Sequence, residues 1–203
     1  MYHFTVFMAV ADFVPVIFFG IAAFLLQRDL YNKMSRTAYG LFTAGTIDVF
    51  AAGLLKAIWK LLYAAGICDF EILNHMMMPL QSIGFWLAGI GLIMMLKKKH
   101  TAALAVAPPV FGGSVLFIIL MSLGLGAICT CMSIVAVRMK QKGAMVLFVL
   151  CFAVSMCMGA LSGLDFSQAW ANWLEQGINS VGQLCLMWGV IILHKEGLAD
   201  FKI

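Results

Sequence analysis

The sequence predicts an all-α integral membrane protein with about six transmembrane helices arranged as an inverted 3+3 repeat. The first observation is composition, because the 203 residues are 64% hydrophobic and 11% charged, with a mean hydropathy of +1.02. Soluble globular domains lie far from these values. One helical crossing needs about 20 mostly apolar residues, so this length holds about six or seven crossings and little else. A separate soluble catalytic domain is therefore excluded.

The second observation is a series of apolar segments bounded by charged clusters. They predict six helices, at about 4–26, 38–62, 73–96, 110–137, 144–162 and 168–194. These segments are too long for transmembrane strands and lack their alternation. The N-terminal segment has no basic region and contains Asp12 and Pro15, so we expect a retained first span rather than a signal peptide.

The third observation is a similarity between the third and sixth segments. Residues 74–97 and 172–195 align without a gap and share six identities, where composition alone predicts roughly two or three. A directly repeated three-helix unit would lie in opposite orientations, because three is odd. We therefore expect one domain, 1–203, with repeats at 1–100 and 101–203. Loop charges are balanced between the two sides in that arrangement and leave the absolute orientation open.

Polar residues inside the sixth segment indicate a site. Asn172, Glu175, Gln176, Asn179 and Gln183 fall within an arc of about 100° on a helix. A charged residue at the bilayer centre costs about 2.5–3.5 kcal/mol, so this stripe should face protein or a cavity. Hydrogen bonding between packed helices is the alternative explanation.

The matching face of the third segment is more apolar than this stripe and includes methionine and aromatic side chains. It carries Asn74, Met78, Gln81 and Phe85. If the two faces meet, the pocket between them is polar on one side and apolar on the other, as small-molecule sites usually are. The predicted substrate-binding residues are Asn172, Glu175, Gln176, Asn179, Gln183, Asn74, Gln81, Met78 and Phe85.

Further ionisable residues lie inside the apolar segments. Asp48 and Glu175 are the candidates for ion or proton coupling, although Asp48 also fits a structural carboxylate. Asp12 is expected near a membrane surface. Lys56 and Lys60 are expected to extend to the membrane surface beside aromatic residues, with pairing of Lys56 to a carboxylate on another helix as the alternative.

No pattern for a metal or cofactor stands out. Three methionines beside His75 suggest copper(I), but consecutive residues point around a helix and do not share one ion. The six cysteines lie mostly in apolar runs, where a thiol acts as a small hydrophobe. Neither a nucleotide-binding loop nor a catalytic motif is present. We expect no metal, no cofactor and no catalytic residue.

These patterns favour a small transporter or facilitator for a polar or amphipathic solute, with its site between the third and sixth helices. Glu175 would be the cation partner or proton carrier. A membrane-embedded enzyme acting on a lipid or prenyl substrate and a non-catalytic ligand-binding subunit are the alternatives. We expect membrane lipids, a small solute and either a homodimer or a partner membrane subunit as partners, in a plasma or inner membrane. A net charge of +4 without a basic, aromatic-rich block excludes nucleic acid.

Overall fold

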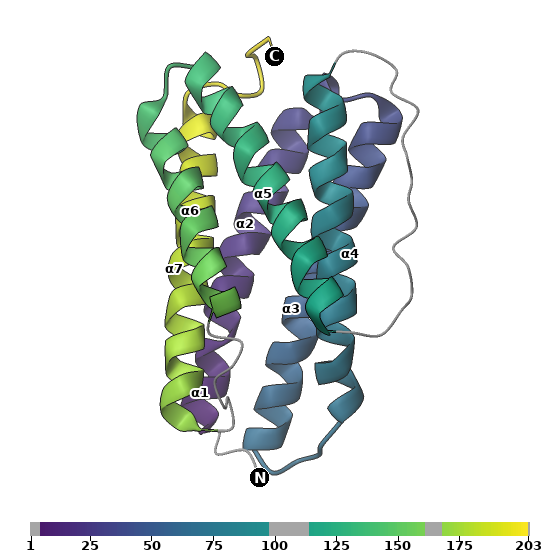
Figure 1. The fold of residues 1–203 in the computed structure, drawn as a ribbon, viewed down its shortest axis with the longest axis vertical. Coiled ribbons are helices and arrows are strands. Elements are labelled where there is room, and N and C mark those ends of the chain that lie inside the picture. The colour runs from purple at the N-terminus through teal and green to yellow at the C-terminus, as the bar shows by residue number, and fades with distance from the viewer. Residues whose placement is uncertain (1–4, 98–113, 161–167, 203) are drawn as a thin grey trace.

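A computed structural model describes residues 5–97, 114–160 and 168–202, and all regular structure within these ranges is helical (Figure 1). The helices overlap all six predicted segments, although residues 4, 110–113 and 161–162 of those segments lie outside the described residues. They are α1 (Val6–Ala11), α2 (Phe13–Leu30), the short 3-10 helix η1 (Tyr31–Lys33), α3 (Arg36–Ala64), α4 (Glu71–Leu96), α5 (Ser114–Arg138), α6 (Lys142–Ala160) and α7 (Ala169–Lys195).

Five helical segments of the described chain are long and apolar enough to cross a membrane. They are Val6–Lys33, Arg36–Ala64, Glu71–Leu96, Val115–Arg138 and Ala169–Lys195. The apolar part of α6, Lys142–Met158, is shorter. The chain is therefore a multi-pass helical membrane protein, as its composition predicted.

The first span is interrupted at Asp12, between α1 and α2. Pro15 explains the break, because proline has no N–H to donate to the carbonyl of Ala11 and its ring crowds that carbonyl. The backbone N–H of Asp12 reaches the carbonyl oxygen of Met8 at 3.2 Å. As a result, a carboxylate stands at an irregular point of a membrane helix.

The helices form a closed ring in chain order. Each helix from α2 to α6 packs against the next, and α7 returns to pack against α2 (Figure 1). In this ring α4 and α7 occupy opposite positions. The third and sixth spans therefore face each other across the centre of the bundle rather than packing side by side.

Contacts between α4 and α5 show that these neighbours run in the same direction. The hydroxyl of Ser82 donates to the carbonyl of Phe117 at 2.9 Å. Further along, a Cβ added at Gly89 would lie 2.9 Å from the carbonyl oxygen of Gly124. Residue numbers thus rise together along both helices. Since α3 packs antiparallel to α4, and α6 antiparallel to both α5 and α7, the two halves share one up–down–up course (Figure 1).

This course does not confirm the inverted repeat. The expectation assumed that the connection between the halves turns back at the side where α4 ends, which would make α5 antiparallel to α4. The connecting residues, 98–113, lie outside the described residues. A two-fold axis along the bundle, rather than across it, is the operation that would bring α2, α3 and α4 onto α5, α6 and α7 in this ring.

Glycine contacts nevertheless match between the halves. A Cβ added at Gly91 would lie 2.9 Å from the Cβ of Phe42 on α3, and one added at Gly189 would lie 2.9 Å from the ring of Phe148 on α6. Both glycines allow close helix packing. They are equivalent in the alignment of the third and sixth segments, and each meets a phenylalanine on the preceding helix. A duplicated helix pair would produce this pattern.

Positive charge is concentrated at one end of the bundle. Apart from Lys56 and Lys60, the basic residues of the described chain lie at the end where α4, α5 and α7 finish (Figure 1). We call this the basic end. Its members are Arg28, Lys33, Arg36, Lys97, Arg138, Lys140, Lys142, Lys195 and Lys202.

Candidate functional site

A cavity of about 220 Å³ lies at the centre of the ring, and every helix from α2 to α7 contributes to its wall. We call it the central cavity. Asp12, at the break in the first span, also reaches it. The polar residues that line it are Asp12, Lys56, Gln81, Ser122, Ser155, Glu175, Gln176, Asn179 and Gln183.

Most of the predicted site residues line this cavity. From α7 these are Glu175, Gln176, Asn179 and Gln183, and from α4 they are Met78, Gln81 and Phe85. The two faces lie on opposite sides of the ring, so they share one space without packing directly against each other.

Three predicted residues lie elsewhere. Asn172 is buried beside the cavity and accepts a hydrogen bond from the ammonium of Lys60. Asn74 is partly exposed near the start of α4. Asp48 is partly exposed halfway along α3, and within the described ranges its carboxylate makes no hydrogen bond or ion pair. None of the three lines the central cavity.

Two glutamine side chains present unpaired acceptors in the cavity wall. Gln176 and Gln183 are only 6% and 7% exposed. The side-chain oxygen of each is buried without a hydrogen-bond partner among the described residues. The amide nitrogen of Gln176 donates to the carbonyl of Met8 at 3.4 Å, which directs its oxygen away from that carbonyl. An unpaired buried acceptor costs about 1–3 kcal/mol, so both oxygens favour a molecule that donates N–H or O–H groups.

Four charged residues form a network beside these glutamines. Lys56 contacts Glu175 at 2.9 Å, and Lys60 contacts Asp12 at 2.6 Å. Lys60 also donates to Asn172. Two ammonium groups and two carboxylates compensate one another, so the network carries no net charge. It joins α3 to α7 and to the break in the first span.

The network corrects the expectation for the two lysines. The side chain of Lys60 is only 3% exposed, and that of Lys56 ends at a carboxylate on another helix. Extension to the membrane surface was therefore wrong, and the alternative of pairing was right for Lys56. Asp12 is enclosed by the bundle, where it pairs with Lys60. One feature of the sequence could have predicted this pairing. Two lysines lie one turn apart in an apolar run, and two carboxylates lie in other apolar runs.

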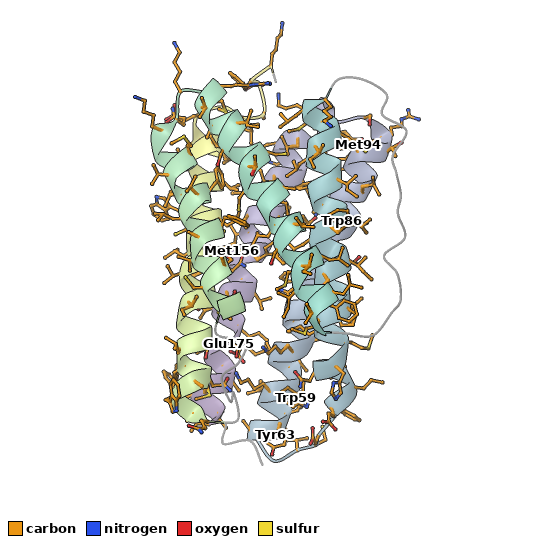
Figure 2. All side chains as sticks on the ribbon, in the orientation of Figure 1. Trp59, Tyr63, Trp86, Met94, Met156 and Glu175 are labelled. Atoms are coloured by element: carbon orange, nitrogen blue, oxygen red, sulfur yellow. The ribbon has the colours of Figure 1, made fainter. Side chains whose placement is uncertain are left out.

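The network lies on the side of the cavity that faces the end opposite the basic end. Figure 2 shows Glu175 between the level of Met156 and that of Trp59 and Tyr63, which lie close to the end of α3. The indole N–H of Trp59 donates to Asp69 in the following turn at 2.9 Å. Aromatic residues at this position are typical of a membrane–water interface.

The remaining wall of the cavity is soft and apolar. Methionines from three helices line it together with Phe85: Met77, Met78, Met121, Met156 and Met158. Methionine adapts its shape because it is unbranched and polarisable. Sequence pattern alone does not single out the methionines of α5 and α6, since they resemble ordinary apolar residues of a membrane span.

Comparison with models of protein families, with curated proteins and with solved structures finds no match for this chain. Within the described residues, no three His, Cys, Asp or Glu side chains gather in a way that could hold a metal ion.

Proposed function

We propose that this protein is a transporter or facilitator that carries a small, uncharged amphipathic solute through the central cavity. The observation that carries the proposal is that the side-chain oxygens of Gln176 and Gln183 are buried, have no partner among the described residues and lie opposite a methionine wall. A solute with N–H or O–H donors at one end and an apolar body satisfies both sides of such a cavity.

The charge network favours an uncharged solute. Every charge that reaches the cavity already has an opposite partner, because Lys56 pairs with Glu175 and Lys60 with Asp12. An added ion would be buried without compensation unless it displaced one of these partners, and an uncompensated buried charge is costly. A neutral donor leaves the network intact.

Glu175 is the proposed coupling residue. It lines the cavity, and a cation or proton that bound there would compete with Lys56 for its carboxylate. The position of Asp48, outside the cavity, gives its predicted coupling role no support. Coupling through Glu175 would therefore require the pair with Lys56 to open first.

The same pairs suggest how access is controlled. They tie α3 to α7 and to Asp12 between the cavity and the end opposite the basic end. Access from that side would require α3 to separate from α7. Transporters built from repeated halves achieve such motion by rocking one half against the other, and parallel as well as inverted repeats do so.

The distribution of charge suggests an orientation. Cytoplasmic loops of membrane proteins carry an excess of Lys and Arg. We therefore propose that the basic end faces the cytoplasm and that the turn between α3 and α4 faces the opposite side. In this orientation the charge network closes the cavity toward the outside.

Three matched compounds test the choice of solute. N-acetyl-leucinamide is neutral, leucinamide is a cation and N-acetyl-leucine is an anion, while all three share one apolar side chain. Purified protein in liposomes should exchange the neutral compound faster than empty liposomes do, and the charged compounds no faster. Binding of the neutral compound without exchange would instead favour a ligand-binding subunit, and its chemical conversion would favour an enzyme.

A further inference from the structure

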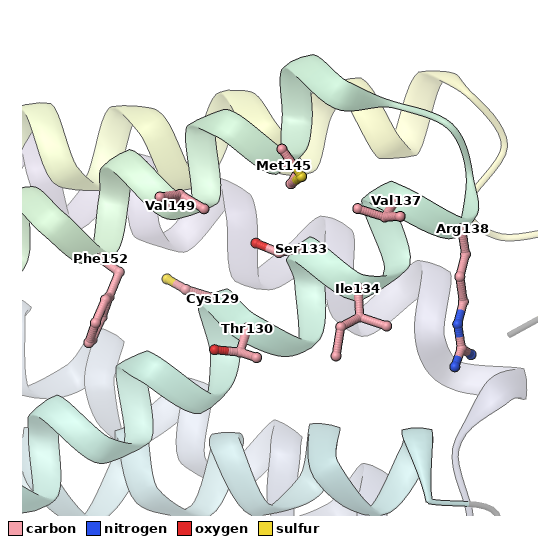
Figure 3. Close-up of a pocket in the computed structure, with 9 residues that line it drawn as sticks. All are labelled: Cys129, Thr130, Ser133, Ile134, Val137, Arg138, Met145, Val149 and Phe152. Carbon is pink, nitrogen blue, oxygen red and sulfur yellow. The ribbon is translucent and has the colours of Figure 1, made fainter.

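A second cavity lies on the outer surface of the bundle, between α5 and α6. It is a groove of about 530 Å³, shown in Figure 3. Ile134, Val137, Val149 and Phe152 provide much of its apolar lining, and Arg138 stands at one end. We call it the α5–α6 groove. It does not share a lining residue with the central cavity.

The surroundings of this groove are lipid. Its helix α5 belongs to the crossing Val115–Arg138. Val137 and Val149 are each 55% exposed, which would be unfavourable in water but is normal where a span meets hydrocarbon. If the groove were empty, the side chains that line it would lose dispersion contacts. An acyl chain is therefore the natural occupant of its apolar part.

The length of the groove matches one leaflet. From Cys129, near Phe152, to Arg138 the helix advances nine residues, or about 14 Å at 1.5 Å per residue. This is about half of a hydrocarbon core that is about 30 Å thick. At the end of the groove away from Arg138, Phe152 packs against α5. A Cβ added at Gly126 would lie 3.1 Å from the ring of Phe152.

The end of the groove that lies at the basic end of the bundle is positively charged. Arg138 is exposed, and in the described part of the chain its guanidinium makes no hydrogen bond or ion pair. Lys140 lies in the turn to α6 and Lys142 begins that helix, and no acidic residue lies between 138 and 142. A guanidinium binds a phosphate through two parallel hydrogen bonds. An anionic headgroup thus complements the end at which an acyl chain would leave the groove.

We propose that the α5–α6 groove binds one anionic diacyl phospholipid, with an acyl chain along α5 and the phosphate at Arg138. Anionic lipids are enriched in the cytoplasmic leaflet, which is where the basic end would place this headgroup. The site does not depend on transport through the central cavity, because the two cavities are separate.

Thermal unfolding of the delipidated protein in detergent tests the proposal. Phosphatidylglycerol and phosphatidylcholine with the same acyl chains are compared. The wild type should be stabilised more by phosphatidylglycerol, and Arg138→Gln should lose that difference while keeping the response to phosphatidylcholine. Ser133→Phe, which fills the groove, should weaken the response to both lipids. Lys97→Gln is the control, since Lys97 also lies at the basic end but not in the groove.

Three results would overturn the proposal. One is an equal shift of the wild type by both lipids. Another is a phosphatidylglycerol preference that survives Arg138→Gln or is lost equally in Lys97→Gln, because the charge at the groove would then be irrelevant. The third is an equal shift by glycerol phosphate alone, because a free anion and not a lipid would be the ligand. Native mass spectrometry, in which Arg138→Gln should retain fewer bound phosphatidylglycerol molecules, checks the same conclusion without unfolding.

Discussion

The ammonium of Lys56 lies 2.9 Å from a carboxylate oxygen of Glu175, and this ion pair joins α3 to α7 at the edge of the central cavity. Both side chains line that cavity. Lys60 and Asp12 form a second pair one turn further along α3. Together the pairs join α3 to α7 and to the first span, and their opposite charges compensate one another.

Removing both members of this pair should cost less stability than the sum of the two single losses. Glu175→Gln leaves the ammonium of Lys56 uncompensated, and we expect a loss of about 3 kcal/mol, the lower value for a buried pair because the site is partly exposed. Lys56→Met should cost a similar amount, and the double variant clearly less than the sum. Unfolding in mixed micelles, analysed as a double-mutant cycle, measures the coupling. Additive losses would show that the pair contributes no stability.

Replacing Gln183, whose side-chain oxygen has no partner among the described residues, should affect ligand binding without lowering the stability of the fold. Gln183→Leu removes a buried acceptor that has no partner in the described chain, so we expect stability to stay equal or to rise by about 1 kcal/mol. Gln27→Leu is the matched control, because Gln27 donates to Thr46 at 2.7 Å. That variant should lose about 1 kcal/mol. A large loss of stability in Gln183→Leu would mean that its side chain has a structural role.

Close packing between α3 and α4 predicts a sharp contrast between two glycines. A Cβ at Gly91 would lie 2.7 Å from the carbonyl oxygen of Ala38, whereas one at Gly40 would meet nothing within 4 Å. Gly91→Ala should therefore destabilise by about 1–3 kcal/mol, the usual cost of overpacking. Gly40→Ala should be neutral or should stabilise by up to about 1 kcal/mol, as expected of Gly to Ala in a helix. Thermal unfolding of both variants decides whether the helices approach as closely as described.

The proposed orientation predicts which thiols are accessible from outside. Cys68 lies in the turn after α3, at the end opposite the basic end. A membrane-impermeant maleimide should label it in intact cells, and Cys68→Ser should remove that label. Adding Gln141→Cys to this variant places a thiol in the turn between α5 and α6, which should react only after permeabilisation. The reverse pattern would invert the orientation.

Hydrophobic pattern was sufficient to locate the helices and two faces of the cavity. The 172–183 stripe needed no tertiary information, because Glu175 and its neighbouring amides are too polar for lipid. Likewise, the similarity of α4 to α7 pointed to Gln81 and Phe85 as a facing wall, and both line the cavity.

What the pattern missed depends on relations between helices. The course of the second half could not be read from helix count, because the direction of α5 is shown only by contacts between helices such as Ser82 with Phe117. The partners of Lys56 and Lys60 are distant in sequence. The hydrophobic pattern therefore does not distinguish lysines that extend to the membrane surface from lysines that pair with carboxylates inside the bundle. Asp48 was predicted as a second coupling candidate beside Glu175, because depth along a helix does not reveal which face is turned inward.

The most direct test of the central claim is the thermal shift that the three matched leucine compounds produce in wild type and in Gln183→Leu. A ligand that binds only the folded state stabilises it by RT ln(1 + L/Kd), where L is the concentration of free ligand. We predict that N-acetyl-leucinamide stabilises the wild type, that leucinamide and N-acetyl-leucine do not, and that Gln183→Leu loses the response while folding normally. Equal stabilisation by a charged compound, or a response to N-acetyl-leucinamide that survives in Gln183→Leu, would contradict a cavity built for an uncharged hydrogen-bond donor.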